Sequence, residues 1–347
     1  MVNRSNQAFA RRHRRRIALF IGLIVLLAAT FVVSLSVGQY TVRLGDLPRI
    51  LAGGPLGVDG MDASVIWQVR IPRLVLGILV GAALGVGGAL MQAVFANPLA
   101  EPSVMGVTSG AGVGAAVFIV SGASFAGTMT IPLGAFVAGV ATTILVWTLA
   151  RHRGKTAVVN LILVGIAVNA VAGAAISFLV FLAPSTAREQ IIFWQMGTLA
   201  GAQWKHVTPV ACIAVFGIAC ALFLGRKLDL LALGESAATH VGVNVQQLRT
   251  VSVLLATLLT AGAVSYAGLI GFVGLVIPHI IRTVVGPSNS VLIPASALGG
   301  AALIAVADVV ARNLIAYADM PIGIFTALVG GPTFFILLRQ MMRKGVH

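Results

Sequence analysis

Long stretches without a charged side chain dominate this sequence. A transmembrane helix needs about 20 consecutive apolar residues, because ~30 Å of hydrocarbon is crossed at 1.5 Å per residue. Asp, Glu, Lys and Arg are absent from 17–42, 74–100, 102–150, 156–187, 206–225, 250–281, 283–307 and 320–338. Several of these stretches are long enough for more than one crossing. The pattern therefore predicts a chain that crosses a membrane many times.

The crossings are expected to be helices, because lipid cannot satisfy backbone polar groups and only helices and closed barrels bury them all. The apolar runs are uninterrupted and lack the period of two that a barrel strand requires. We predict an all-α integral membrane protein in which a basic tail (1–16) precedes a single transmembrane domain (17–347). About ten helices are expected, near 17–37, 66–94, 103–121, 131–150, 157–182, 207–225, 249–267, 269–284, 291–310 and 322–339.

The charge distribution predicts how the chain is oriented. The chain has 23 Lys and Arg against nine Asp and Glu, a net charge of +14. Most of these cations lie at the ends of predicted helices, on the same side as the basic run 11–16, which argues against nucleic acid as a partner. Because cytoplasmic loops are enriched in Lys and Arg, both termini are expected in the cytoplasm. The apolar run after residue 16 is too long for a cleaved signal peptide, so we expect a multi-pass protein of the bacterial cytoplasmic (inner) membrane.

One polar segment, Arg226 to Arg249, interrupts the second half of the chain and reads RKLDLLALGESAATHVGVNVQQLR. A short amphipathic helix, a Gly-containing turn and a basic end are predicted there, on the cytoplasmic side. Such a segment is suited to contact a soluble partner. The chain has no G-x-x-x-x-G-K-[ST] phosphate-binding loop and no evident nucleophile–base arrangement, so we do not expect it to be an enzyme.

Four blocks of sequence carry a resemblance to a known family. They are VRIPRLVLGILVGAALGVGGALMQAVFANPLAEPSVMGVTSGA (69–111), LALGESAATHVGVN (231–244), GLIGFVGLVIPHIIR (268–282), and DVVAR through DMPIGIFTALVGGPTFFILL (308–338). Together they resemble the FecCD-type permeases of bacterial ABC importers, the group that contains the vitamin B12, iron–siderophore and haem permeases.

The resemblance implies the type II ABC importer permease architecture, with ten transmembrane helices per subunit. It also implies a second permease subunit, identical or different, two cytoplasmic ATPase subunits, and a periplasmic or lipid-anchored binding protein. ATP and magnesium would then bind to the ATPase, and no cofactor is expected in this chain. The substrate implied first is an iron–siderophore complex, with haem and vitamin B12 as alternatives. An ion-coupled secondary transporter is a further alternative, and an intramembrane enzyme is disfavoured by the missing catalytic residues.

The resemblance also assigns roles to particular residues. Within 226–249, which would couple the chain to the ATPase, the matching residues are Gly234, Glu235, Ala238 and Gly242. The alternative is a solvated loop helix. On the outer face, the residues that would meet glutamates of the binding protein are Arg70, Arg73 and Arg312. For these arginines the alternative is contact with lipid head groups, which long cationic side chains often make.

By the same resemblance, the pathway would lie between two permease copies. It would be lined by the helices near 157–182 and 322–339 and by a short helix near 190–203. The polar or flexible candidates there are Asn160, Asn169, Ser177, Gln195, Met196 and Thr198. Asp308 is the only acidic residue in a predicted span, so the paired charges typical of proton-coupled carriers are not evident. His279 is either a structural histidine or a haem or metal ligand; the remaining histidines lack metal-ligand spacing, and no metal site is predicted.

Overall fold

The computed structural model describes residues 2–55, 60–152, 155–156, 158–315 and 317–344. Ten helices form the body of the protein: α1 (Val2–Ser36), α4 (Ile71–Val94), α5 (Val107–Ser121), α6 (Thr130–Ala150), α7 (Val158–Leu182), α9 (Trp204–Leu231), α11 (Val245–Ala267), α12 (Val273–Val285), α13 (Asn289–Leu314) and α14 (Ile322–Lys344). Eight spans within the described residues are long and apolar enough to cross a membrane; α5 and α12 are shorter apolar helices.

Short elements connect these helices. They are η1 (Leu44–Asp46), α2 (Leu47–Gly53), α3 (Met61–Ser64), the π-helical turn η2 (Val65–Arg70), η3 (Pro102–Met105), η4 (Gly127–Met129), α8 (Ser185–Met196) and α10 (Glu235–His240). The strands β1 (Arg151–His152) and β2 (Lys155–Thr156) form a small antiparallel hairpin, with Arg151 opposite Thr156. The all-helical membrane fold is thus confirmed.

Helix α4 lies at the centre, and glycines let its neighbours approach closely. A Cβ atom built on Gly81 would lie 2.2 Å from the carbonyl oxygen of Gly300 in α13, and one on Gly85 would lie 2.2 Å from that of Ser296. A Cβ on Gly88 would meet the carbonyl of Gly274 in α12. Small residues allow such backbone contact between membrane helices. The glycine-rich stretch 81–90 therefore makes α4 the helix on which α12 and α13 pack.

Two segments of irregular backbone enter the helix bundle. Residues 95–106 join α4 to α5, and residues 268–272 join α11 to α12. At 1.5 Å per residue, α5 and α12 are only about 20 Å long, shorter than the ~30 Å hydrocarbon. The predicted helices at 103–121 and 269–284 therefore begin too early, because their apolar composition continues through residues that are not helical. Phe272, which precedes α12, adopts the left-handed conformation (φ 68°) that non-glycine residues rarely take.

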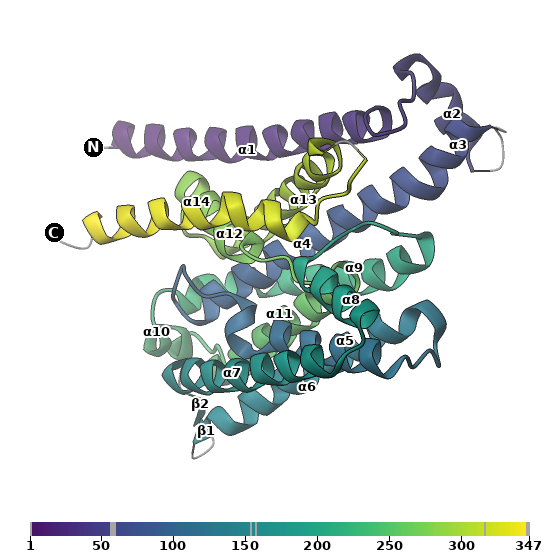
Figure 1. Cartoon of the computed structure of the whole chain (residues 1–347). Helices are drawn as coiled ribbons and strands as arrows, with labels where there is room; N and C mark the ends of the chain where they lie inside the picture. Colours follow the sequence, from purple (N-terminus) through teal and green to yellow (C-terminus); the bar gives the residue numbers. More distant parts are fainter. Residues whose placement is uncertain (1, 56–59, 153–154, 157, 316, 345–347) are drawn as a thin grey trace.

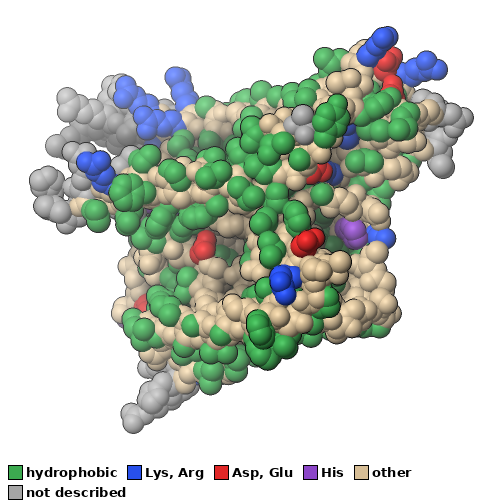
Figure 2. All heavy atoms as spheres, in the orientation of Figure 1, with side chains coloured by type: hydrophobic (Ala, Val, Ile, Leu, Met, Phe, Trp, Pro, Cys, Tyr) green, Lys and Arg blue, Asp and Glu red, His purple; other side chains and the backbone are tan. Residues whose placement is uncertain are grey.

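Both chain termini lie at one end of the bundle, together with α10 and the β1–β2 hairpin (Figure 1). We call this the terminus end. The opposite end carries α2, α3 and the turn between α13 and α14 (Figure 1). Figure 2 shows a largely hydrophobic face between the two ends, with Lys and Arg mostly toward its edges. Helix α1 begins at Val2 rather than near 17, so the basic tail extends the first span as one helix.

Candidate functional site

A buried ion cluster ties α4 to α13 at the opposite end. Arg73 donates from Nε to Oδ1 of Asp308 at 2.8 Å and from Nη1 to Oδ2 of Asp319 at 2.9 Å. Arg73 is 7% exposed and Asp308 is 1% exposed. A charge in such a place is tolerated only when it is paired and hydrogen-bonded. The Arg73 guanidinium meets this condition by holding one carboxylate on α13 and one on the turn before α14.

The two other arginines of the predicted docking set fasten α1 and the residues that follow it. Arg312 donates from Nη2 to the backbone oxygen of Ser34 at 2.7 Å and to its Oγ at 2.8 Å. Arg70 donates to the carbonyl oxygens of Leu35 and Tyr40. Both arginines are buried. Internal acceptors therefore hold part of each guanidinium group, while Nε of Arg312 has no partner among the described residues.

The three arginines nevertheless share one cavity. Arg70, Arg73 and Arg312 line a space of about 390 Å³ together with Tyr317 and Asp319. An acidic side chain of a binding protein would have to enter this cavity and compete with the internal acceptors to reach them. Docking through these arginines stays a prediction. The exposed cations nearby on the same end are Arg43 and Arg49, which the motif comparison did not single out because they lie before the first matching block.

The polar segment 226–249 forms a helix end, a short helix and a helix start. Arg226 and Asp229 belong to the last turns of α9, α10 covers Glu235–His240, and α11 begins at Val245. Gly234 (φ 114°) and Gly242 (φ 85°) bracket α10 in backbone conformations that L side chains rarely adopt. The predicted short helix and glycine turn are therefore present. The glycines set the path of the chain into and out of α10.

The residues assigned to ATPase coupling differ in their surroundings. Ala238 is completely buried, so it seats α10 on the bundle and offers no surface to a partner in this conformation. Glu235 is exposed and pairs within the chain, accepting a hydrogen bond from Nη2 of Arg249 at 2.6 Å. Two apolar neighbours that the motif comparison passed over are strongly exposed, Leu233 by 74% and Val241 by 63%. Leu233, Glu235 and Val241 together form an exposed, partly apolar surface, which we call the α10 surface.

Asp229, inside the same polar segment, has a structural role. Its carboxylate accepts hydrogen bonds from the Oγ atoms of Ser288 and Ser290, at 3.1 and 2.6 Å, and from the backbone amide of Asn289. These residues form the start of α13, whose first amides lack partners within the helix. A negative charge there is stabilised by the helix dipole. Asp229 therefore fixes α9 to the beginning of α13 at the terminus end.

The predicted pathway residues fall on α7, α8 and the segment after α8. Helix α8 covers Ser185–Met196, so the short helix expected near 190–203 begins and ends earlier than predicted. The side chain of Asn169 is hydrogen-bonded within the chain. Its Oδ1 accepts a hydrogen bond from Ser109 Oγ at 2.6 Å, and its Nδ2 donates one to the carbonyl oxygen of Ser103 at 3.2 Å. Asn169 thus ties α7 to the irregular segment before α5.

The other pathway candidates are partly buried or exposed. Ser177 is exposed and donates to the carbonyl of Gly173, while Thr198 Oγ1 accepts from the amide of Ala200 at 3.0 Å. The partly buried ones are Asn160, Gln195 and Met196. Helices α7 and α14 bury little of their surface: only 22% and 17% of their most apolar windows are inside. Only α1, at 11%, is buried less among the spans of the described chain, so α7 and α14 leave large faces for lipid or a second subunit.

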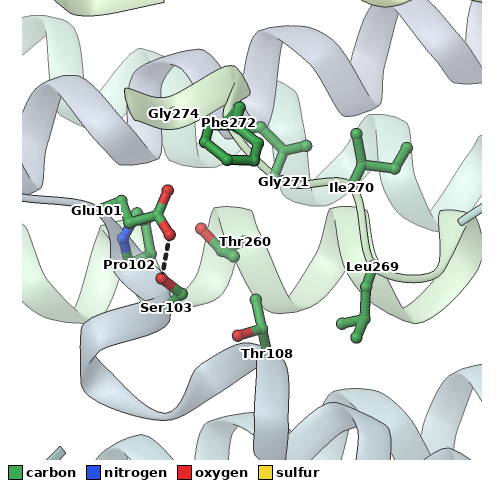
Figure 3. Close-up of a pocket in the computed structure, with 11 residues that line it drawn as sticks. Glu101, Pro102, Ser103, Thr108, Thr260, Leu269, Ile270, Gly271, Phe272 and Gly274 are labelled. Carbon is green, nitrogen blue, oxygen red and sulfur yellow. Dashed lines mark hydrogen bonds between the residues drawn. The ribbon is translucent and has the colours of Figure 1, made fainter. Parts of the chain in front are cut away.

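A further cavity, of about 150 Å³, lies where the two irregular segments meet. Its lining includes Glu101 and Ser103 from 95–106, Thr260 from α11 and Phe272 from 268–272. Figure 3 shows the Glu101 carboxylate, bonded to the Ser103 hydroxyl, inside this cavity. Sequence reasoning overlooked Glu101 because it falls between two predicted helices.

No group of three or more His, Cys, Asp or Glu among the described residues is placed to hold a metal ion. His279 is buried in α12, and its Nδ1 has no hydrogen-bond partner among the described residues.

Comparison with known proteins identifies the family to which this chain belongs. The model of the FecCD transport family matches residues 26–340. The haemin transport permease HmuU of Yersinia pestis is 40% identical over 284 residues, covering 80% of this chain and 85% of the relative. The cobalamin import permease BtuC of Halobacterium salinarum is 41% identical over 293 residues, covering 82% and 76%.

A solved structure shows the same architecture. An inward-facing conformation of a metal-chelate type ABC transporter matches with a TM-score of 0.82 and 33% sequence identity. The match covers 93% of this chain and 99% of the other. The apolar spans and these matches identify an integral membrane protein.

Proposed function

Because this chain belongs to the FecCD transport family and is an ABC importer permease, we propose that it carries a bulky metal chelate across the cytoplasmic membrane by alternating access. Two permease copies or related chains would form the pathway between the exposed faces of α7 and α14. The observation that carries this proposal is the family match over residues 26–340 together with the match to a metal-chelate type transporter.

ATP hydrolysis is assigned to separate cytoplasmic subunits, which would bind ATP and magnesium. The α10 region supports this assignment, because Leu233 and Val241, on either side of the helix, are exposed at the end that carries both termini. Exposed apolar side chains beside charged ones are suited to a protein interface. In this arrangement the terminus end faces the cytoplasm, and the opposite end receives a periplasmic or lipid-anchored binding protein.

The substrate proposed from the sequence is an iron–siderophore complex. Haem and vitamin B12 are alternative substrates. They are supported by relatives that are 40% and 41% identical and are named as haemin and cobalamin permeases. The pathway candidates, such as Asn160, Ser177 and Thr198, have neutral side chains. They would therefore bind a large ligand only weakly. The binding protein is then expected to select the chelate.

The proposal is tested with the complete transporter in proteoliposomes, supplied with ATP inside and its binding protein outside. Uptake of labelled ferric siderophores, haem and cobalamin is measured in parallel. Saturable uptake of one chelate, abolished by a hydrolysis-deficient ATPase, supports the proposal. Transport of none of the three, with free metal ions or anions carried instead, contradicts the substrate class.

A further inference from the structure

The structure assigns a binding site for one monovalent metal cation, Na⁺ or K⁺, to the cavity between residues 95–106 and 268–272. Glu101 supplies the negative charge, and neutral oxygens from Ser103, Thr260 and the backbone of 270–271 complete the site. This inference goes beyond the proposed transport of a chelate. Its test is a binding measurement that does not depend on transport.

The first observation is a carboxylate without a cationic partner. The described residues contain three salt bridges, and none of them includes Glu101. Its one hydrogen-bond partner in the described chain is the Ser103 hydroxyl. Glu101 is partly buried, and an ionised carboxylate that loses part of its water is costly unless it is paired. A bound cation would neutralise Glu101 where the chain supplies no Arg or Lys.

The second observation is an unused hydroxyl in the same cavity. Thr260 is 2% exposed, and its Oγ1 has no hydrogen-bond partner among the described residues. Figure 3 shows this hydroxyl directed toward the Glu101 carboxylate, across from Ser103. Buried polar atoms are nearly always satisfied. An oxygen left free beside a carboxylate is placed to act as a metal ligand.

The third observation is the broken helix beside the cavity. Leu269, Ile270 and Gly271 line it. The Leu269 carbonyl oxygen packs against Gly197 and Gly323, whereas no backbone hydrogen bond in the described chain ends on the carbonyl oxygens of Ile270 and Gly271. In discontinuous membrane helices, unwound carbonyls of this kind coordinate Na⁺. The break is held in place by Phe272, whose side chain packs against Gly330 of α14: a Cβ on Gly330 would lie 2.4 Å from the Phe272 Cβ.

The donor set selects a monovalent ion. One carboxylate and several neutral oxygens balance a single positive charge, whereas a divalent ion would leave a net charge inside the bundle. Ca²⁺ sites usually combine several carboxylates, and Mg²⁺ is bound through one or two carboxylates plus waters and phosphates. The cavity volume of about 150 Å³ has room for the ion and some of its water, since a water occupies ~30 Å³ of liquid. Leu84, near the midpoint of α4, lines the cavity and places it deep in the bundle.

The test is equilibrium binding of ²²Na⁺ and of ⁸⁶Rb⁺, a potassium substitute, to the purified full-length protein in detergent. Thermal unfolding is followed in NaCl, KCl and choline chloride at equal ionic strength. Saturable binding of one ion and a higher unfolding temperature in that ion than in choline are expected, because a ligand that binds the folded state stabilises it. Glu101→Gln keeps the shape, removes the charge and should weaken binding at least tenfold. Thr260→Val should weaken it less.

The matched control is Glu189→Gln, which removes an exposed carboxylate on α8 and should leave binding unchanged. Glu101→Gln should also fold in choline, since it no longer buries a charge, and this keeps the test interpretable. The inference is overturned if the wild-type protein binds neither ion and unfolds at the same temperature in all three salts. It is also overturned if Glu101→Gln binds like the wild type.

Discussion

Arg73 on α4 and Asp308 on α13 form a buried ion pair, with 2.8 Å between Nε and Oδ1. The residues are 235 positions apart in the sequence. Their pairing explains why two charged side chains are tolerated at the end of a closely packed, apolar helix pair. Asp319 extends the pair to the turn that leads into α14, so the cluster links the central helix pair to a helix of the proposed pathway.

Replacing one partner of this pair should be strongly destabilising. Asp308→Asn leaves Arg73 buried without its main counter-charge, and removing one partner of a buried pair costs about 3–5 kcal/mol. The double variant Arg73→Met/Asp308→Leu should lose much less, because neither buried charge of the pair then remains and Asp319, which loses Arg73, has a side chain that is 39% exposed. Unfolding of the purified protein in detergent measures both effects. Asp46→Asn, at an exposed position of the same end, is the control. Additive losses in the double variant would contradict the pairing.

Gly81 should not tolerate a side chain. A Cβ atom there would lie 2.2 Å from the carbonyl oxygen of Gly300, so Gly81→Ala must push α4 and α13 apart. Overpacking of this kind costs about 1–3 kcal/mol, measurable as a lower unfolding temperature. Gly22→Ala in α1 is the matched control, since no atom lies within 4 Å of the new Cβ. That variant should be neutral or slightly stabilising, because alanine favours helix over glycine.

The α10 surface should couple the permease to its ATPase through Leu233 and Glu235. Leu233→Asp places a charge at a position whose side chain is 74% exposed. Glu235→Arg replaces the partner of Arg249 with a second cation. Each variant should fold normally, since an exposed pair contributes no more than about 1 kcal/mol. Each should reduce binding-protein-stimulated ATP hydrolysis severalfold. Leu44→Asp, exposed at the opposite end, should have no effect on hydrolysis.

Gly242 tests the same surface differently. Its φ of 85° makes any larger residue strained by about 1–3 kcal/mol, so Gly242→Ala should displace α10 rather than alter its chemistry. Loss of coupling in Gly242→Ala with normal coupling in Leu233→Asp and Glu235→Arg would show that placement of α10 matters and its exposed side chains do not.

Binding-protein docking should depend on exposed and buried arginines in different ways. Arg49→Glu changes an exposed charge and should weaken docking severalfold, more at low salt than at high salt, because salt screens exposed charges. Its unfolding temperature should stay the same. Arg70→Glu should weaken docking and also destabilise the fold, because Arg70 holds the carbonyls of Leu35 and Tyr40. The affinity for the binding protein, measured in nanodiscs, reports the effect on docking, and unfolding in detergent reports the effect on stability. Unchanged docking by both variants would contradict an arginine-based interface.

The sequence predicted the helices and the short polar segment because both depend on local pattern. Charge-free runs marked the spans, and the glycines at 234 and 242 marked the turns around α10. Contacts made only by the folded chain were not predictable in this way. Nothing local pairs Arg73 with Asp308, and nothing local buries Ala238.

The two irregular segments, 95–106 and 268–272, could not be predicted from the sequence pattern either. Residues 268–272 are apolar and continue the pattern of the helices beside them, so periodicity alone extended the helix through Phe272. Glu101 was missed because it falls between the predicted helices at 66–94 and 103–121. The short length of α5 and α12 reveals that this backbone enters the bundle, and it brings Glu101 to Thr260.

ATP hydrolysis by a separate subunit is expected to drive import through this chain. The most direct measurement is chelate uptake into proteoliposomes that contain the permease, its ATPase and its binding protein, with ionophores collapsing all ion gradients. Uptake should persist with ionophores and stop when ATP is omitted or the ATPase subunit is left out. Uptake that needs an ion gradient and continues without the ATPase would contradict it.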